Sequence, residues 1–159
     1  METKLRITSW ISGTTLLRIG ISSVFLWFGC QQFLSPEMWI GFIPQWVLDI
    51  SPIGPVTLVH LNGALELVFG TALMFGLFTR ASALVLGLHM AHITIMVGYD
   101  SIGVRDFGLA IAALSVFFNG ADSLTIDHTI LFPPEVGEEI ESGVKQTKPF
   151  KYVPGEFHI

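Results

Sequence analysis

Charged residues and cysteines are both scarce in this sequence of 159 residues. Only 13% of the residues are Asp, Glu, Lys or Arg, whereas a soluble domain has about 25%. The single cysteine, Cys30, has no partner for an intramolecular disulfide or a Cys-x-x-Cys pair, which excludes a dithiol-type oxidoreductase. The sequence also has no basic nucleic-acid-binding pattern, Gly-rich dinucleotide loop or set of cysteine ligands.

Apolar residues dominate the chain instead. They make up 51% of the sequence, and the mean hydropathy is +0.64, which is typical of an integral membrane protein. A spanning helix needs about 20 mostly apolar residues, and short connections between such helices favour an all-α, up-down four-helix bundle. We predict one bundle domain over 1–119 and a polar tail over 120–159. The predicted spans are about 13–34, 55–77, 81–98 and 102–119.

The basic residues predict how the bundle is oriented. On one side of the membrane only Arg105 is basic, and Arg18 lies inside a span. Because cytoplasmic loops carry the excess of Lys and Arg, we expect both termini to be cytoplasmic in a multi-pass protein of the cell inner membrane. The residues on that cytoplasmic side are Lys4, Arg6, Arg80, Lys145, Lys148 and Lys151.

The longest connection, 35–54, contains Trp39, Phe42 and Trp46 among three prolines. Aromatic rings favour the headgroup layer, so we expect this segment to lie along the outer interface and cap the bundle. It is either an anchor or a lid over a site that opens to the outer leaflet.

Glu66 stands in the middle of the second apolar run, where an ionised side chain costs about 2.5–3.5 kcal/mol. Helical spacing places it on one face with Asn62 and with small residues that permit close helix approach. The depths of the residues let Arg18 reach Glu66, either as a structural ion pair or as a catalytic pair. The predicted interior polar network is Arg18, Asn62, Glu66, His89 and His92.

A second group of polar residues falls near the outer surface, where it could hold a quinone head group. Arg105 and Asp106 could instead form only an interfacial pair. His89 and His92 have ligand-like spacing, but histidines also join helices by hydrogen bonds, so we predict no metal site and no intrinsic cofactor. The outer group is Gln31, Gln32, His60, Tyr99, Arg105 and Asp106.

Several motifs follow one another along the bundle. They are LRIG at 17–20, GALELVFG at 63–70, GLFTRASA at 76–83 and NGADSLTID at 119–127. Over about residues 13–128 this pattern resembles the DoxX family of small four-helix membrane proteins, which includes subunits of thiosulfate:quinone oxidoreductase. Gln32 and Ala121 depart from the family pattern, which has Lys and Pro there.

The resemblance implies membrane redox association, with quinone-linked oxidation of a small sulfur compound such as thiosulfate as one form. It leaves open whether the chain is itself an enzyme. The alternative is a non-catalytic accessory subunit of a larger membrane complex, docked through the tail and 35–54. A third hypothesis is a permease-like protein that binds a small molecule or lipid. The expected partners are the lipid bilayer and other protein subunits, with no nucleic acid.

Overall fold

The computed structural model describes residues 12–131, which form helices and no strands. Each of the four long helices in this range is long and apolar enough to cross a membrane. The predicted all-helical membrane fold is therefore confirmed. The long helices are α1 (Gly13–Leu34), α4 (Pro55–Phe75), α5 (Thr79–Val97) and α6 (Ser101–Asn119); the short ones are α2 (Glu37–Ile40), α3 (Gln45–Ile50) and α7 (Ile126–Leu131).

Local capping explains where the long helices begin and end. Helix α4 starts with Pro55 in its first turn and stops before Gly76, whose φ of 67° is left-handed, a common helix ending for glycine. The predicted span ran two residues further, to 77. Helix α6 begins after Asp100, whose carboxylate accepts hydrogen bonds from the N–H groups of Ile102 and Gly103, each at 2.8 Å.

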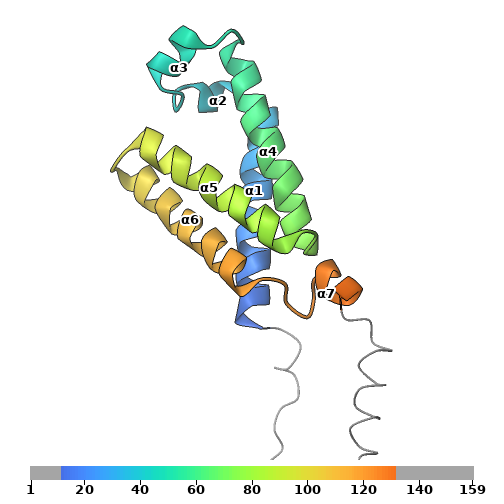
Figure 1. The fold of residues 1–159 in the computed structure, drawn as a ribbon. Helices are drawn as coiled ribbons and strands as arrows, with labels where there is room; N and C mark the ends of the chain where they lie inside the picture. The colour runs from blue at the N-terminus through green and yellow to red at the C-terminus, as the bar shows by residue number, and fades with distance from the viewer. Residues whose placement is uncertain (1–11, 132–159) are drawn as a thin grey trace, which may run out of the picture.

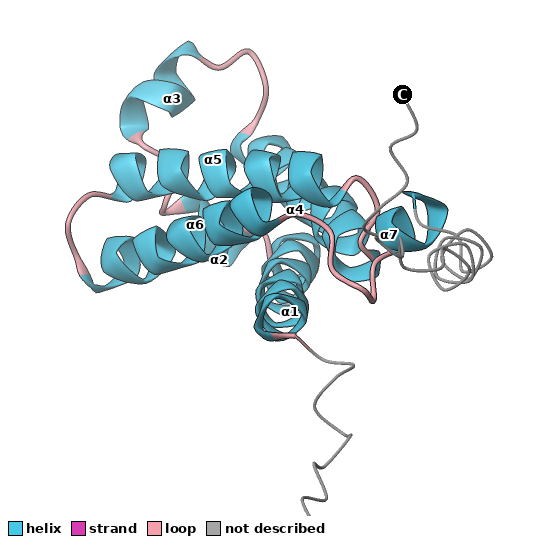
Figure 2. Ribbon diagram, turned by 60° about the horizontal axis from the view of Figure 1, so that its bottom comes forward, coloured by secondary structure: helices cyan, strands magenta, loops and turns pink. Residues whose placement is uncertain are grey.

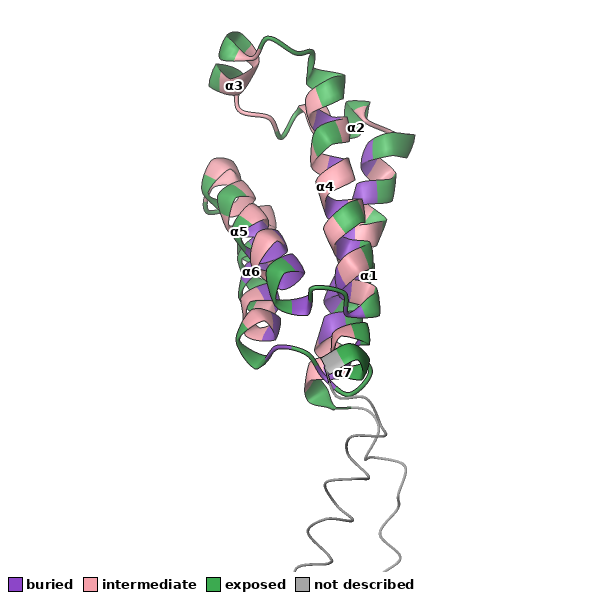
Figure 3. Cartoon of the chain, turned by 45° about the vertical axis from the view of Figure 1, so that its right-hand side comes forward, coloured by how far each residue is buried: buried purple, intermediate pink, exposed green. Residues whose placement is uncertain are grey.

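The four long helices form two pairs, with α1 packed on α4 and α5 packed on α6 (Figure 1). The pairs meet near the start of α1 and diverge toward α2 and α3, as Figures 1 and 3 show. We call these the closed end and the open end. The buried core lies where the pairs meet, and it includes Phe25, Leu73, Leu86 and Val116, all fully buried.

Two glycines allow α1 and α4 to cross closely. A Cβ atom on Gly29 would lie 2.9 Å from the carbonyl oxygen of Gly63, and one on Gly63 would lie 3.1 Å from that of Gly29. Because these contacts are so short, a larger residue in place of either glycine would push the two helices apart. The crossing brings Gln32, one turn beyond Gly29, against the face of α4 that carries Glu66.

Residues 120–131 pack across the closed end, where α7 lies beside the end of α4 (Figure 2). The Asp127 carboxylate accepts hydrogen bonds from the N–H groups of Phe78 and Thr79 at 2.9 and 2.6 Å. This contact caps α5, which begins two residues earlier than predicted. The first part of the predicted tail is therefore part of the bundle, and residues 132–159 lie outside the described range.

Candidate functional site

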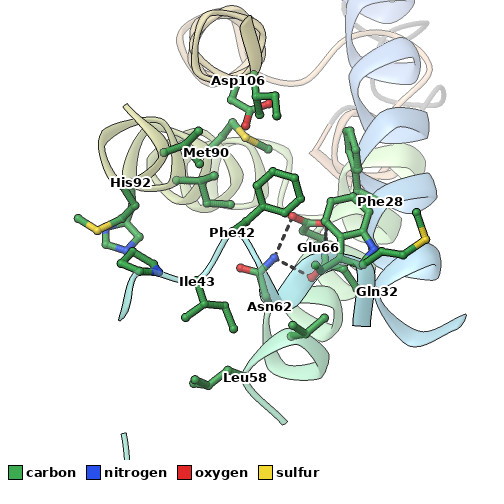
Figure 4. A pocket seen from close by; sticks show the side chains of 18 of the residues that line it. Phe28, Gln32, Phe42, Ile43, Leu58, Asn62, Glu66, Met90, His92 and Asp106 are labelled. Atoms are coloured by element: carbon green, nitrogen blue, oxygen red, sulfur yellow. Dashed lines mark hydrogen bonds between the residues drawn. The ribbon is translucent and has the colours of Figure 1, made fainter. Parts of the chain in front are cut away.

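Glu66 is the centre of a buried polar cluster at the α1–α4 crossing (Figure 4). Its side chain accepts a hydrogen bond from Gln32 Nε2 at 2.9 Å and another from Asn62 Nδ2 at 3.2 Å. Asn62 Nδ2 also donates to Gln32 Oε1 at 2.8 Å. Glu66 is 2% exposed, so these amides replace the water that a buried carboxylate would otherwise need.

His89 brings the second helix pair to this cluster. Its Nε2 atom lies 3.5 Å from Glu66 Oε1 and makes no hydrogen bond, although the atom is buried. The contact joins α4 to α5, so a change in the separation of the two pairs changes this distance. The structure thus brings together three residues of the predicted interior network, Asn62, Glu66 and His89.

Arg18 does not pair with Glu66, and the prediction that it could do so is wrong. Its guanidinium lies at the closed end, where Nε donates to Asp122 Oδ2 at 2.8 Å. Nη1 donates to the carbonyl oxygens of Leu73 and Met74. The side chain is 1% exposed, and these partners place it in a structural role rather than in a catalytic pair with Glu66.

The reason for the error is the partner's place in the chain. Asp122 follows the last span, 104 residues from Arg18, where neither helical spacing nor depth within a span points to it. Burial acts to raise the pKa of Asp122, but hydrogen bonds from Arg18 and from the N–H of Leu124 outweigh it and hold the pKa below its ordinary value. A buried arginine requires such a counter-charge, and that requirement was the available signal.

A cavity of about 660 Å³ lies between the helix pairs on the open side of the Glu66 cluster. Most of its lining is apolar or aromatic, and part of it comes from α2, α3 and the residues between them. Part of 35–54 is therefore cavity wall, and its role as a lid stays a prediction. The polar lining residues are Gln32, Asn62, Glu66, His92, Arg105 and Asp106; the residues from 35–54 are Met38, Trp39, Phe42, Ile43, Pro44 and Val47.

Arg105 and Asp106 form a pair in the cavity wall. Arg105 Nε donates to Asp106 Oδ1 at 2.8 Å, and Nη2 lies at the same distance from that atom. The Asp106 side chain is 5% exposed and that of Arg105 is 50% exposed. The guanidinium also lies 5.0 Å from the centre of the Phe28 ring, a cation–π distance.

The structure divides the predicted outer group of polar residues. Gln32, Arg105 and Asp106 line the cavity, but the remaining three residues do not. Tyr99 is almost fully exposed, and His60 stacks on Phe33 with the ring centres 4.9 Å apart. His92 lines the cavity without joining the Glu66 cluster. The residues outside the lining are Gln31, His60 and Tyr99.

These features define a small multi-pass membrane protein with a cavity between two helix pairs. A family model described as DoxX matches residues 13–98, which is more than half of the chain. The chain belongs to the DoxX family. No curated protein and no solved structure matches it.

Proposed function

We propose that this chain is a membrane subunit of a quinone-linked redox system and that its cavity binds the quinone. The observation that supports this most is the cavity itself, about 660 Å³ of mostly apolar and aromatic wall with the Gln32–Asn62–Glu66 cluster at one end. Binding pockets for small lipophilic molecules are typically of this size and composition. A quinone has a planar polar ring and an apolar tail, which suits both parts of the cavity.

Quinone reduction consumes two electrons and two protons. Glu66 lines the cavity and His89 lies 3.5 Å behind it, so these two ionisable groups are the proposed proton carriers. The electrons would come from a small sulfur compound such as thiosulfate. Two thiosulfate ions release two electrons when an S–S bond forms between them. In this proposal the chain lies in the inner membrane with its closed end facing the cytoplasm, so the cavity opens toward the outer side.

The first experiment measures retention of a decyl-benzoquinone by the full chain in lipid nanodiscs. Ile93 lines the cavity, so Ile93→Trp fills it and is expected to lower the affinity at least about tenfold. Ile95 lies on the same helix but is 74% exposed, so Ile95→Trp is the matched control and should bind normally. No binding by the wild-type chain, or equal binding by both variants, contradicts the proposal.

An accessory subunit without a ligand is the alternative. It predicts that the chain copurifies with partner proteins in mild detergent whether or not quinone is present, and that Ile93→Trp leaves this assembly and its activity intact. Under the quinone proposal, the same variant assembles normally but lowers the quinone-linked activity of the complex. The two functions are separated by isolating the tagged chain from native membranes, identifying the proteins that copurify and measuring the quinone-linked activity of the complex.

A further inference from the structure

The hydrogen bonds of the Glu66 cluster leave Asn62 with an acceptor, rather than a donor, facing the cavity. A side-chain amide carries two N–H donors, and Asn62 directs both at oxygen atoms, Gln32 Oε1 at 2.8 Å and Glu66 Oε1 at 3.2 Å. The orientation of this amide follows from the same contacts, because an oxygen in place of Nδ2 would face two other oxygens. The carbonyl oxygen of Asn62 is therefore the atom left over.

This oxygen is available to a ligand. Figure 4 shows it turned away from Gln32 and Glu66, and Asn62 is part of the cavity lining. Among the described residues, no side chain or backbone group donates a hydrogen bond to it. Gln32 retains one donor hydrogen, but its side chain is 3% exposed and its Nε2 already points at Glu66.

The donors elsewhere in the cavity lining, on Trp27, Trp39, His92 and Arg105, lie outside the Glu66 cluster. Arg105 directs Nε and Nη2 at Asp106, and its half-exposed side chain can complete its remaining hydrogen bonds with water. Within the Glu66 cluster, a ketone oxygen that lies against Asn62 would face its carbonyl oxygen, which has no hydrogen to donate.

We propose that the Asn62 carbonyl oxygen selects a ligand that donates a hydroxyl hydrogen, so that the cavity binds the quinol form more tightly than the quinone form. The inference rests on the proposed function and names the redox form that the site prefers. An unpaired buried acceptor corresponds to a loss of about ten- to hundredfold in affinity. We therefore expect at least a tenfold preference for the hydroxylated ligand.

The preference has a consequence for electron transfer. Tighter binding of the reduced form raises the reduction potential of the bound two-electron couple, by about 30 mV for each tenfold difference in affinity. A quinone in this cavity would thus be a better electron acceptor than the same quinone free in the membrane.

The test compares two ligand pairs on the full chain in lipid nanodiscs, by quenching of the fluorescence of Trp27 and Trp39, which line the cavity. The first pair is decyl-hydroquinone and decyl-benzoquinone without oxygen; the second is nonylphenol and nonylanisole, which undergo no redox change. In each pair the hydroxylated ligand should bind at least tenfold more tightly. Asn62→Leu should reduce the ratio to less than about threefold, whereas His60→Leu, a control on the same helix outside the cavity, should preserve it.

The outcomes separate the two proposals. If all four ligands fail to bind, the proposed quinone site is wrong and this inference falls with it. If the ligands bind but benzoquinone and anisole bind as tightly as their hydroxylated partners, the quinone site stands and the donor preference is overturned. If the wild-type preference persists in Asn62→Leu, Asn62 is not the residue that selects the ligand. The wild-type comparison alone decides the main point, even where a variant fails to fold.

Discussion

The buried ion pair between Arg18 and Asp122 at the closed end makes Asp122→Asn the most informative stability test. The substitution removes one charge from a contact whose partner, Arg18, is 1% exposed. The Asp122 carboxylate accepts hydrogen bonds from Arg18 Nε at 2.8 Å and from the N–H of Leu124 at 2.9 Å. An asparagine has one oxygen acceptor, so it can serve only one of these donors, and its NH₂ group then faces the other.

Breaking a buried ion pair costs about 3–5 kcal/mol. We expect the lower end, about 3 kcal/mol, because Arg18 keeps the carbonyl oxygens of Leu73 and Met74 as partners. The free energy of unfolding can be measured by titrating sodium dodecyl sulfate into mixed micelles at pH 7. Asp49→Asn is the control, since Asp49 is exposed and bonded only to Gln45 within its own short helix.

The pH dependence gives an independent check. Because the pKa of folded Asp122 lies below its ordinary value of 3.8, the stabilisation is complete above about pH 4 and is lost as the pH falls through the folded pKa. The difference in stability between the wild type and Asp122→Asn should therefore shrink under acid. A difference below about 1 kcal/mol at pH 7, or one that stays constant into acid, would refute the structural role given to this pair.

Two glycines yield further predictions. Gly63→Ala places a methyl group 3.0–3.1 Å from atoms of α1 and should cost about 1–3 kcal/mol of stability, measured in the same titration, while Gly20→Ala, with open space around it, should cost nothing measurable. Gly76→Ala combines a left-handed φ with a Cβ only 2.3 Å from that of Thr125, so it should loosen 120–131 and speed proteolysis there. Gly98→Ala also has a positive φ but no nearby atoms, and proteolysis as fast in this variant would contradict the steric explanation.

The sequence predicted the four spans to within two residues at either end because the signal is local. Apolar run length, Pro55, Gly76 and Asp100 each act within a turn or two of their own position. The end of α4 and the start of α5 were each missed by two residues, and the cap of α5 comes from Asp127, far along the chain.

The site was predicted only in part. Helical spacing correctly placed Asn62 and Glu66 on one face. The depth of each residue in the membrane, by contrast, predicts contacts between helices only if the helices are parallel, and it does not give their rotation. In the structure the pairs diverge, and of the two histidines predicted for the network only His89 approaches Glu66. Depth alone also could not show that Gln32 belongs to this cluster, because the close crossing at Gly29 and Gly63 decides that contact.

The sequence by itself determined that this chain is a helical membrane protein and that Glu66 must be neutralised, paired or used. The free energy of placing an apolar segment in the bilayer is favourable and that of placing a charge there is unfavourable, and both depend little on the rest of the fold. Only the tertiary structure decided which residues satisfy the buried charges: Asp122 for Arg18, and Gln32 and Asn62 for Glu66. It also decided that a cavity lies beside Glu66. Hydrogen bonds are short and directional, so their partners depend on the tilt, rotation and crossing of helices, which no single segment specifies.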